Sequence, residues 1–375
     1  MSLCSLKERK DRVVQPYINE NLPEKYHKKQ ILMYYQFDIL ADMLFKANEY
    51  NLAENRLRGE ILKEVKADED IIEFLMNKQK DSEVAKILKP HLFFSILADF
   101  TDFILESLRC IEKGKVIVSF SLSRKPLQDN LFYLCWLLTK PEDLISKLLK
   151  AEDSSIYDIS KIRRNNKDEV KKVLKEACNI LSTQHEINPG HYKPEILYDL
   201  IYEKSSPSGM SSIWDQSVHL VTSNRNYKTK PGNINFLFSN EENLSEFMET
   251  YFQKMPILLD FCLELCVNLY EDILNIPRSL RDINFLIRTI KRHEGFNMPI
   301  LPLRDFFEEK LPDHVSFVCD NCSREFSMTD EIAYEYFRDP LVTCSHCGFF
   351  ERTGKYLIGN EQLEELKSKL IIDLD

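Results

Sequence analysis

Glycine and proline are scarce in this sequence, whose 375 residues include only 9 glycines and 15 prolines. Leucine, isoleucine, lysine and glutamate are abundant and run in long stretches without helix breakers, a composition that favours helices. The nine glycines are scattered and form no glycine-rich phosphate loop, and the sequence contains neither a GxSxG elbow nor an HExxH helix. The commonest sequence motifs of nucleotide-binding proteins and hydrolases are therefore excluded.

Long apolar runs and an excess of positive charge are also missing. The most apolar stretches, such as LFYLCWLL at 131–138, are too short to span a bilayer, and the N-terminus carries charges where a signal peptide needs its apolar core. The net charge of -10 disfavours a broad, sequence-blind nucleic-acid binder. Apart from two CxxC pairs near the C-terminus, the cysteines lie mostly in apolar stretches, which is expected of a protein from a reducing compartment. We expect a cytoplasmic protein with no membrane partner.

Apolar residues recur at three- and four-residue steps from about residue 26 to 51, the spacing of an amphipathic helix. The sequence predicts further helices at 54–66, 69–79, 84–112, 116–139, 141–150, 166–183, 194–203, 211–221, 241–274, 277–293 and 360–371. Residues 184–240 are the least regular part, where a functional loop is expected. The predicted fold is mainly α: an all-helical domain (1–296), a proline-containing linker (297–311), and a zinc-ribbon domain with a C-terminal helix (312–375).

Two CxxC pairs lie in the predicted ribbon, separated by 21 residues and flanked by strand-like segments. A two-residue gap lets both sulfurs of a pair face one ion, and four thiolates complete the tetrahedral shell of structural zinc. A helix with Thr329 as its cap is expected between the pairs. His314 and His346 are alternative ligands, but the simpler set is all-cysteine: Cys319, Cys322, Cys344 and Cys347.

A zinc ion with four protein ligands has no open position for water, so we expect one structural Zn²⁺ and no catalysis at this site. The ribbon is expected to present a surface to a protein partner. RNA remains an alternative ligand, because zinc ribbons often bind nucleic acid. Acidic residues outnumber basic ones in this ribbon, however, and the basic residues near its tips are Arg324, Arg338, Arg352 and Lys355.

Arg124 and Asp129 interrupt an apolar helix, where a charge generally needs a partner, and His219 is a candidate partner for Asp129. The segments SRKPLQDN and SVHLVT resemble an uncharacterised helical bacterial family, a domain of unknown function with a C-terminal zinc ribbon, over roughly residues 85–270. That family pairs an arginine-leucine-leucine-glutamate-like helix with a later histidine segment. Here aspartate replaces the glutamate and Pro126 enters the helix. Two interpretations of Arg124, Asp129 and His219 are open. They form a buried polar network that fixes the register of the helices, or Asp129 orients His219, which acts as a general base or contacts a phosphate.

The segment RTIKRHEGF places Arg288 five residues before His293, which resembles the arginine-x4-histidine motif of HEPN ribonucleases. Those helical proteins cleave RNA without a metal, usually as dimers, so the resemblance implies a catalytic pair and a homodimer. The family favours a polar residue after the arginine, and Thr289 fits this loosely.

Two functions of different class follow. The first is an intracellular interaction module, with a place in a bacterial defence or stress system, whose zinc ribbon recruits a partner. The second is a metal-independent ribonuclease that uses Arg288 and His293, or a hydrolase that uses His219. A nuclease needs its arginine and histidine exposed in one cleft, whereas a structural network is buried and fully paired.

Overall fold

The computed structural model describes residues 22–65, 69–183, 193–206, 209–235, 241–298, 316–327 and 341–374, and the single positions 329, 332 and 336. The helices of these ranges are η1 (Glu24–Tyr26), α2 (His27–Glu49), η2 (Glu60–Glu64), α3 (Ile71–Asn77), α4 (Asp81–Glu112), α5 (Val116–Lys125), η3 (Pro126–Asn130), α6 (Leu131–Thr139), α7 (Pro141–Lys150), η4 (Ser154–Ile156), α8 (Ile159–Asn165), α9 (Lys167–Thr183), α10 (Pro194–Ile201), α11 (Ser211–Val218), α12 (Glu241–Ile273), α13 (Arg278–Gly295) and α16 (Asn360–Ser368). The strands are β1 (Arg56–Arg58), β2 (Ser316–Val318), β3 (Glu325–Ser327), β4 (Leu341–Thr343), β5 (Phe350–Arg352) and β6 (Ile371–Asp373). The prediction of a mainly α fold is confirmed.

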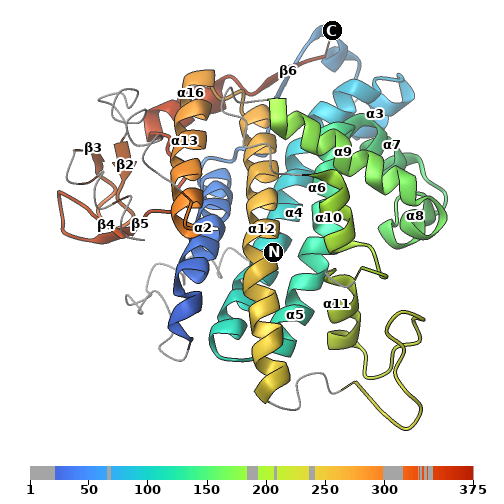
Figure 1. The fold of residues 1–375 in the computed structure, drawn as a ribbon. Coiled ribbons are helices and arrows are strands. Elements are labelled where there is room, and N and C mark those ends of the chain that lie inside the picture. The colour runs from blue at the N-terminus through green and yellow to red at the C-terminus, as the bar shows by residue number, and fades with distance from the viewer. Residues whose placement is uncertain are drawn as a thin grey trace.

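Helix α12 forms the centre of the helical body, between α2 on one side and α4, α5 and α6 on the other (Figure 1). Residues 261–270 of α12 are all buried, which is the pattern of a helix that is covered on every side. Aromatic pairs fill the contacts around it, including Tyr26 stacked on Phe252 at 4.3 Å between ring centroids. In the part of the chain that the structure describes, no helix is both long enough and apolar enough to cross a membrane.

The predicted helix at 54–66 is wrong. Residues 56–58 form strand β1, which pairs in parallel with β6 near the other end of the chain, and a short 3-10 helix follows. Gly59, with φ of +144°, ends the strand in a conformation that side chains rarely adopt. The pairing strand comes from more than 300 residues away, so no local pattern could have indicated it.

The predicted helix at 116–139 is continuous in direction but contains one wide turn. Pro126 has no N–H to donate, and the chain passes through the π-helical turn η3, in which the Leu131 N–H donates to the Pro126 carbonyl. This turn separates α5 from the strongly buried α6.

Two small hairpins, β2–β3 and β4–β5, lie beside α13 and α2 (Figure 1). Their apolar residues, among them Phe317 and Phe326, pack with Leu286, Ile287 and Ile290 of α13 in a core separate from that of the body. The predicted capping role of Thr329 is seen in its hydroxyl, which accepts a hydrogen bond from the Ile332 N–H at 3.3 Å.

The chain then leaves the hairpins and returns to the helical body. Gly354 lies directly against α2, where a Cβ atom would come within 2.6 Å of the Tyr35 carbonyl oxygen. The last segment, with Tyr356, Leu363 and Leu374, belongs to the core of the body. The predicted linker 297–311 falls largely outside the described residues.

Candidate metal centre

The two CxxC pairs adopt the same backbone conformation. After the second cysteine of each pair the chain takes a left-handed residue, Ser323 (φ +57°) and Gly348 (φ +71°). The Ser323 N–H donates to the Cys319 carbonyl at 2.8 Å, and the Gly348 N–H donates to the Cys344 carbonyl at 2.9 Å. Each pair is therefore a tight turn that directs both thiols to the same side.

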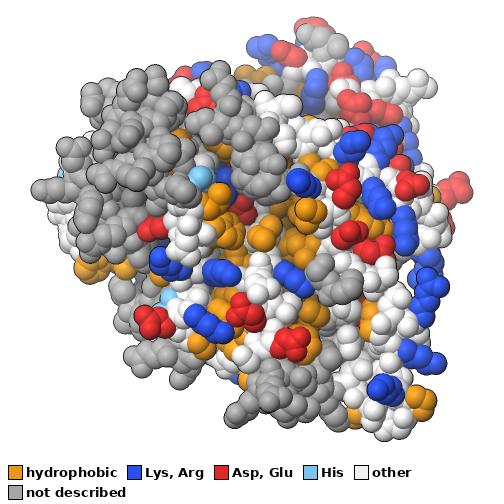
Figure 2. Space-filling view, in the orientation of Figure 1, with side chains coloured by type: hydrophobic (Ala, Val, Ile, Leu, Met, Phe, Trp, Pro, Cys, Tyr) orange, Lys and Arg blue, Asp and Glu red, His pale blue; other side chains and the backbone are white. Residues whose placement is uncertain are grey.

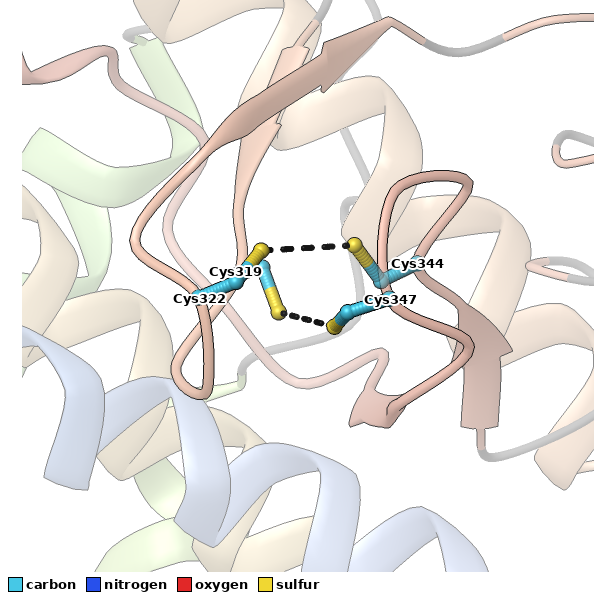
Figure 3. A group of neighbouring side chains, drawn as sticks. All are labelled: Cys319, Cys322, Cys344 and Cys347. Atoms are coloured by element: carbon cyan, nitrogen blue, oxygen red, sulfur yellow. Dashed lines mark hydrogen bonds between the residues drawn. The ribbon is translucent and has the colours of Figure 1, made fainter.

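The four sulfur atoms converge on one point between the hairpins (Figure 3). All lie within 4.8 Å of one another, and the Cys319–Cys347 and Cys322–Cys344 sulfurs are 3.6 and 3.9 Å apart. A tetrahedral ion with metal–sulfur bonds of about 2.3 Å requires sulfur separations of about 3.8 Å. The cluster therefore has the dimensions needed to hold a metal ion.

The environment of the thiols differs between the two pairs. The Phe349 N–H and the Asn321 amide donate to the sulfur of Cys347 and lower the pKa of this exposed thiol to about 7. Burial raises the pKa of Cys319 instead. Metal binding requires thiolates, and a cation at the centre would supply the positive charge that buried Cys319 lacks.

A second layer of charges supports the first turn. The Glu351 carboxylate accepts from the Asp320 N–H at 2.7 Å and from the Lys355 ammonium at 2.8 Å, although its own side chain is fully buried. Despite the opposing effect of burial, the carboxylates of Asp320 and Glu351 raise the pKa of Lys355. The ring of His346 bonds to the Glu325 carbonyl at 2.9 Å, in agreement with an all-cysteine ligand set. His314 lies outside the described residues.

The second turn is exposed as a whole, from Ser345 to Phe350. Phe349 and Phe350 are 37% and 53% exposed, although phenylalanine is usually buried. Two consecutive phenylalanines that follow the second CxxC pair are therefore partly exposed to solvent.

Of the residues predicted to form a polar site, Arg124 takes a partner that was not predicted. Its guanidinium lies 3.1 Å from Oδ1 of Asp215. The other carboxylate oxygen, Oδ2, accepts from the Lys204 ammonium at 2.8 Å and from the Tyr227 hydroxyl. Burial raises the pKa of Asp215, but hydrogen bonds from Lys204 and Tyr227 outweigh it, so the pKa lies below its usual value.

Asp129 lies in η3, and burial raises its pKa while the nearby positive charge of Arg124 opposes this. His219 follows α11 and is exposed, and its carbonyl accepts from the Asn235 amide at 2.9 Å. The acid at the centre of this cluster is Asp215. The sequence did contain an indication of this role for Asp215. The acid directly follows the apolar residues Ile213 and Trp214, just as the charged Arg124 interrupts an apolar helix.

The predicted ribonuclease residues Arg288 and His293 both lie on α13. Arg288 is 3% exposed and donates two hydrogen bonds to Glu264 of α12, at 3.0 and 2.9 Å. Arg292 bridges Glu264 and Asp260 at 2.6 and 2.8 Å. Both guanidiniums are therefore buried and ion-paired, as in a structural network, although Nη1 of Arg288 and Oε1 of Gln36 have no hydrogen-bond partner among the described residues.

His293 is half-buried on the same helix, and its carbonyl accepts from the Met298 N–H at 2.7 Å. Gln36 of α2 completes the buried network, since its amide donates to Asp260 at 3.1 Å. The network therefore joins α2 and α13, beside which the two hairpins lie, to the central helix α12.

Comparison of the chain with family models, with curated proteins and with solved structures finds no match in any of the three.

Proposed function

We propose that this protein is an intracellular interaction module in which a structural zinc ion holds an exposed aromatic turn ready for a protein partner. The observation that carries the proposal is the exposure of Phe349 and Phe350 directly after Cys347. Exposed aromatic rings on a rigid backbone are typical anchors of protein interfaces, because they bury a large area at little entropic cost.

Zinc is the ion favoured by the ligand chemistry. Four thiolates in a tetrahedral arrangement suit zinc or iron, and we favour zinc because it is the usual ion of structural sites with four cysteines. Because all four positions would be filled by cysteine, the ion would stabilise the turn and leave no open site for catalysis.

The charges near the turn favour a protein over a nucleic acid. Exposed Asp320 and Glu325 lie on the neighbouring turn and strand, where they would repel phosphates, while Arg324 and Arg352 are exposed cations nearby. Arg352 is engaged with Asp38 of α2 at 2.7 Å, so it serves the attachment of the hairpin to the body.

The test is a comparison of bound partners in cells that express tagged variants at equal levels. We expect the Phe349→Ser/Phe350→Ser variant to keep its metal and lose a protein that the wild type enriches. The Leu148→Ser/Leu149→Ser variant is the matched control, because these α7 residues are 37% and 40% exposed. A set of partners that is the same for wild type and both variants would refute the proposal.

A further inference from the structure

One end of the molecule differs in charge from the rest of this acidic chain. Residues 113–128 and 216–235 together contain seven basic residues and no acidic one, although the whole chain carries a net charge of -10. The two segments meet in space, since α5 packs on α11 and the Ser121 hydroxyl donates to the Ser217 carbonyl at 3.1 Å.

Five of these cations are exposed and, among the described residues, form no ion pair with an acid: Lys113, Lys115, Arg225, Lys228 and Lys230. The other two are engaged, Arg124 with Asp215 and Lys125 with Asp99. Exposed Glu246 of α12 lies toward the same end, because its neighbour Phe247 packs against Phe120 of α5. We call the five cations the cationic end.

The same surface exposes aliphatic side chains. Six of the sixteen large hydrophobic residues that are exposed in the described part of the chain lie here, at 40–63% exposure: Ile117, Val118, Val218, Leu220, Val221 and Ile234. Single exposed apolar residues are ordinary, whereas a cluster of them marks an interaction surface. Figure 2 shows basic and apolar side chains together at its lower right, over the loop that follows α11.

This loop is built to hold its tips outward. Thr222 accepts from the Thr229 N–H at 2.9 Å and donates to the Tyr227 carbonyl at 2.7 Å, and the Asn235 N–H donates to the Leu220 carbonyl. The Tyr227 hydroxyl is bound to Asp215 within the cluster described above. In Figure 1 the loop extends away from the helices at the lower right.

We propose that this end docks on an anionic lipid surface, with the aliphatic side chains entering the headgroup region and the cationic end contacting lipid phosphates and carboxylates. The proposal concerns a different face from the zinc-bound turn and does not depend on the proposed function. It departs from the expectation of no membrane partner, which considered only helices that span the bilayer.

A lipid surface suits these residues better than a nucleic acid or a protein groove. Single-stranded nucleic acids are bound by stacking on aromatic rings, but the one tyrosine of residues 216–235 is turned inward to Asp215. The exposed aliphatic residues lie at the base of this loop, where Leu220 and Asn235 pair, and its projecting turns carry Arg225, Lys228 and Lys230. The surface thus combines the two weak signals, apolar and cationic, that reversible membrane binding requires.

The test uses the full-length protein and vesicles of phosphatidylcholine with or without phosphatidylserine, in a co-sedimentation assay at low and high salt. We expect binding only to the phosphatidylserine vesicles, and weaker binding at high salt. Each cation near an anionic surface strengthens binding about fivefold, so Lys228→Glu/Lys230→Glu should weaken it by at least about 25-fold. Leu220→Ser/Val221→Ser should also abolish sedimentation.

Matched controls carry the same changes on other faces. Lys172→Glu/Lys175→Glu on α9 alters two exposed lysines, and Ile156→Ser/Ile196→Ser alters two residues that are 46% and 59% exposed. Both should bind vesicles as the wild type does, and all variants should keep the wild-type circular dichroism spectrum. Absence of wild-type binding to either vesicle would overturn the proposal. So would binding of a labelled single-stranded RNA, lost in Lys228→Glu/Lys230→Glu, without vesicle binding.

Discussion

Replacement of Arg288 by alanine separates a structural role of this residue from a catalytic one. The guanidinium makes two hydrogen bonds to Glu264, and both side chains are at most 7% exposed. Removal of one partner from a buried ion pair costs about 3–5 kcal/mol, because the remaining charge stays buried. Glu264 keeps its contact with Arg292, so we expect the lower end, about 3 kcal/mol.

Arg278 offers an internal control on the same helix. It pairs with Asp282 four residues later, but the two side chains are 59% and 48% exposed. An exposed pair of this kind contributes less than about 1 kcal/mol, so Arg278→Ala should be nearly neutral. Urea unfolding followed by circular dichroism measures both variants, and equal slopes would show that the unfolded states are comparable.

The result that would refute this reasoning is equal stability of Arg288→Ala and Arg278→Ala. If, in addition, the wild type degrades total RNA in expressing cells and Arg288→Ala does not, the ribonuclease hypothesis would be favoured. A loss of about 3 kcal/mol with intact RNA in every strain would identify Arg288 as part of the support beneath the hairpins.

Three further outcomes follow from the structure. Cys322→Ser should abolish binding of one zinc ion per chain, measured by elemental analysis, whereas His346→Ala should retain it. Gly348→Ala should cost about 1 kcal/mol because its φ is +71°, and Ser323→Gly should stabilise by a similar amount, both measured by urea unfolding. Burial raises the pKa of Glu271 from 4.5 to about 7, so its contribution to stability is full below pH 4.5 and is lost as pH rises through 7. Glu271→Gln should therefore gain up to about 3 kcal/mol over the wild type at pH 8 relative to pH 4.5, and an unchanged pH dependence would contradict this assignment.

Periodicity predicted most helices because their information is local. In α9, buried Val170, Val173, Leu174 and Ala177 repeat every three or four residues, and the predicted 166–183 agrees with Lys167–Thr183. The same reasoning failed at 54–66, where a helix was predicted but residues 56–58 form a strand whose partner is distant in the chain. Propensity cannot indicate such a pairing.

The metal cluster could be predicted residue by residue, because its ligands occur as two local pairs with fixed spacing. The polar clusters could not, because their geometry depends on how helices pack. Arg124 was expected to need a partner, and its partner is Asp215 of α11, a residue that was not predicted from the sequence. Similarly, the spacing of Arg288 and His293 gave no indication that Glu264 of α12 faces the arginine.

The return of the chain to the body makes the metal-binding hairpins an insertion rather than an appendage. They leave from α13 and end at Tyr356, after which α16 and β6 fill the body's core and pair with β1. A truncation before residue 316 would therefore remove core side chains such as Leu363 and Leu374 as well as the hairpins. The body and the hairpins should be produced together, and a partner bound at the aromatic turn would be held in a fixed orientation to every other face of the molecule.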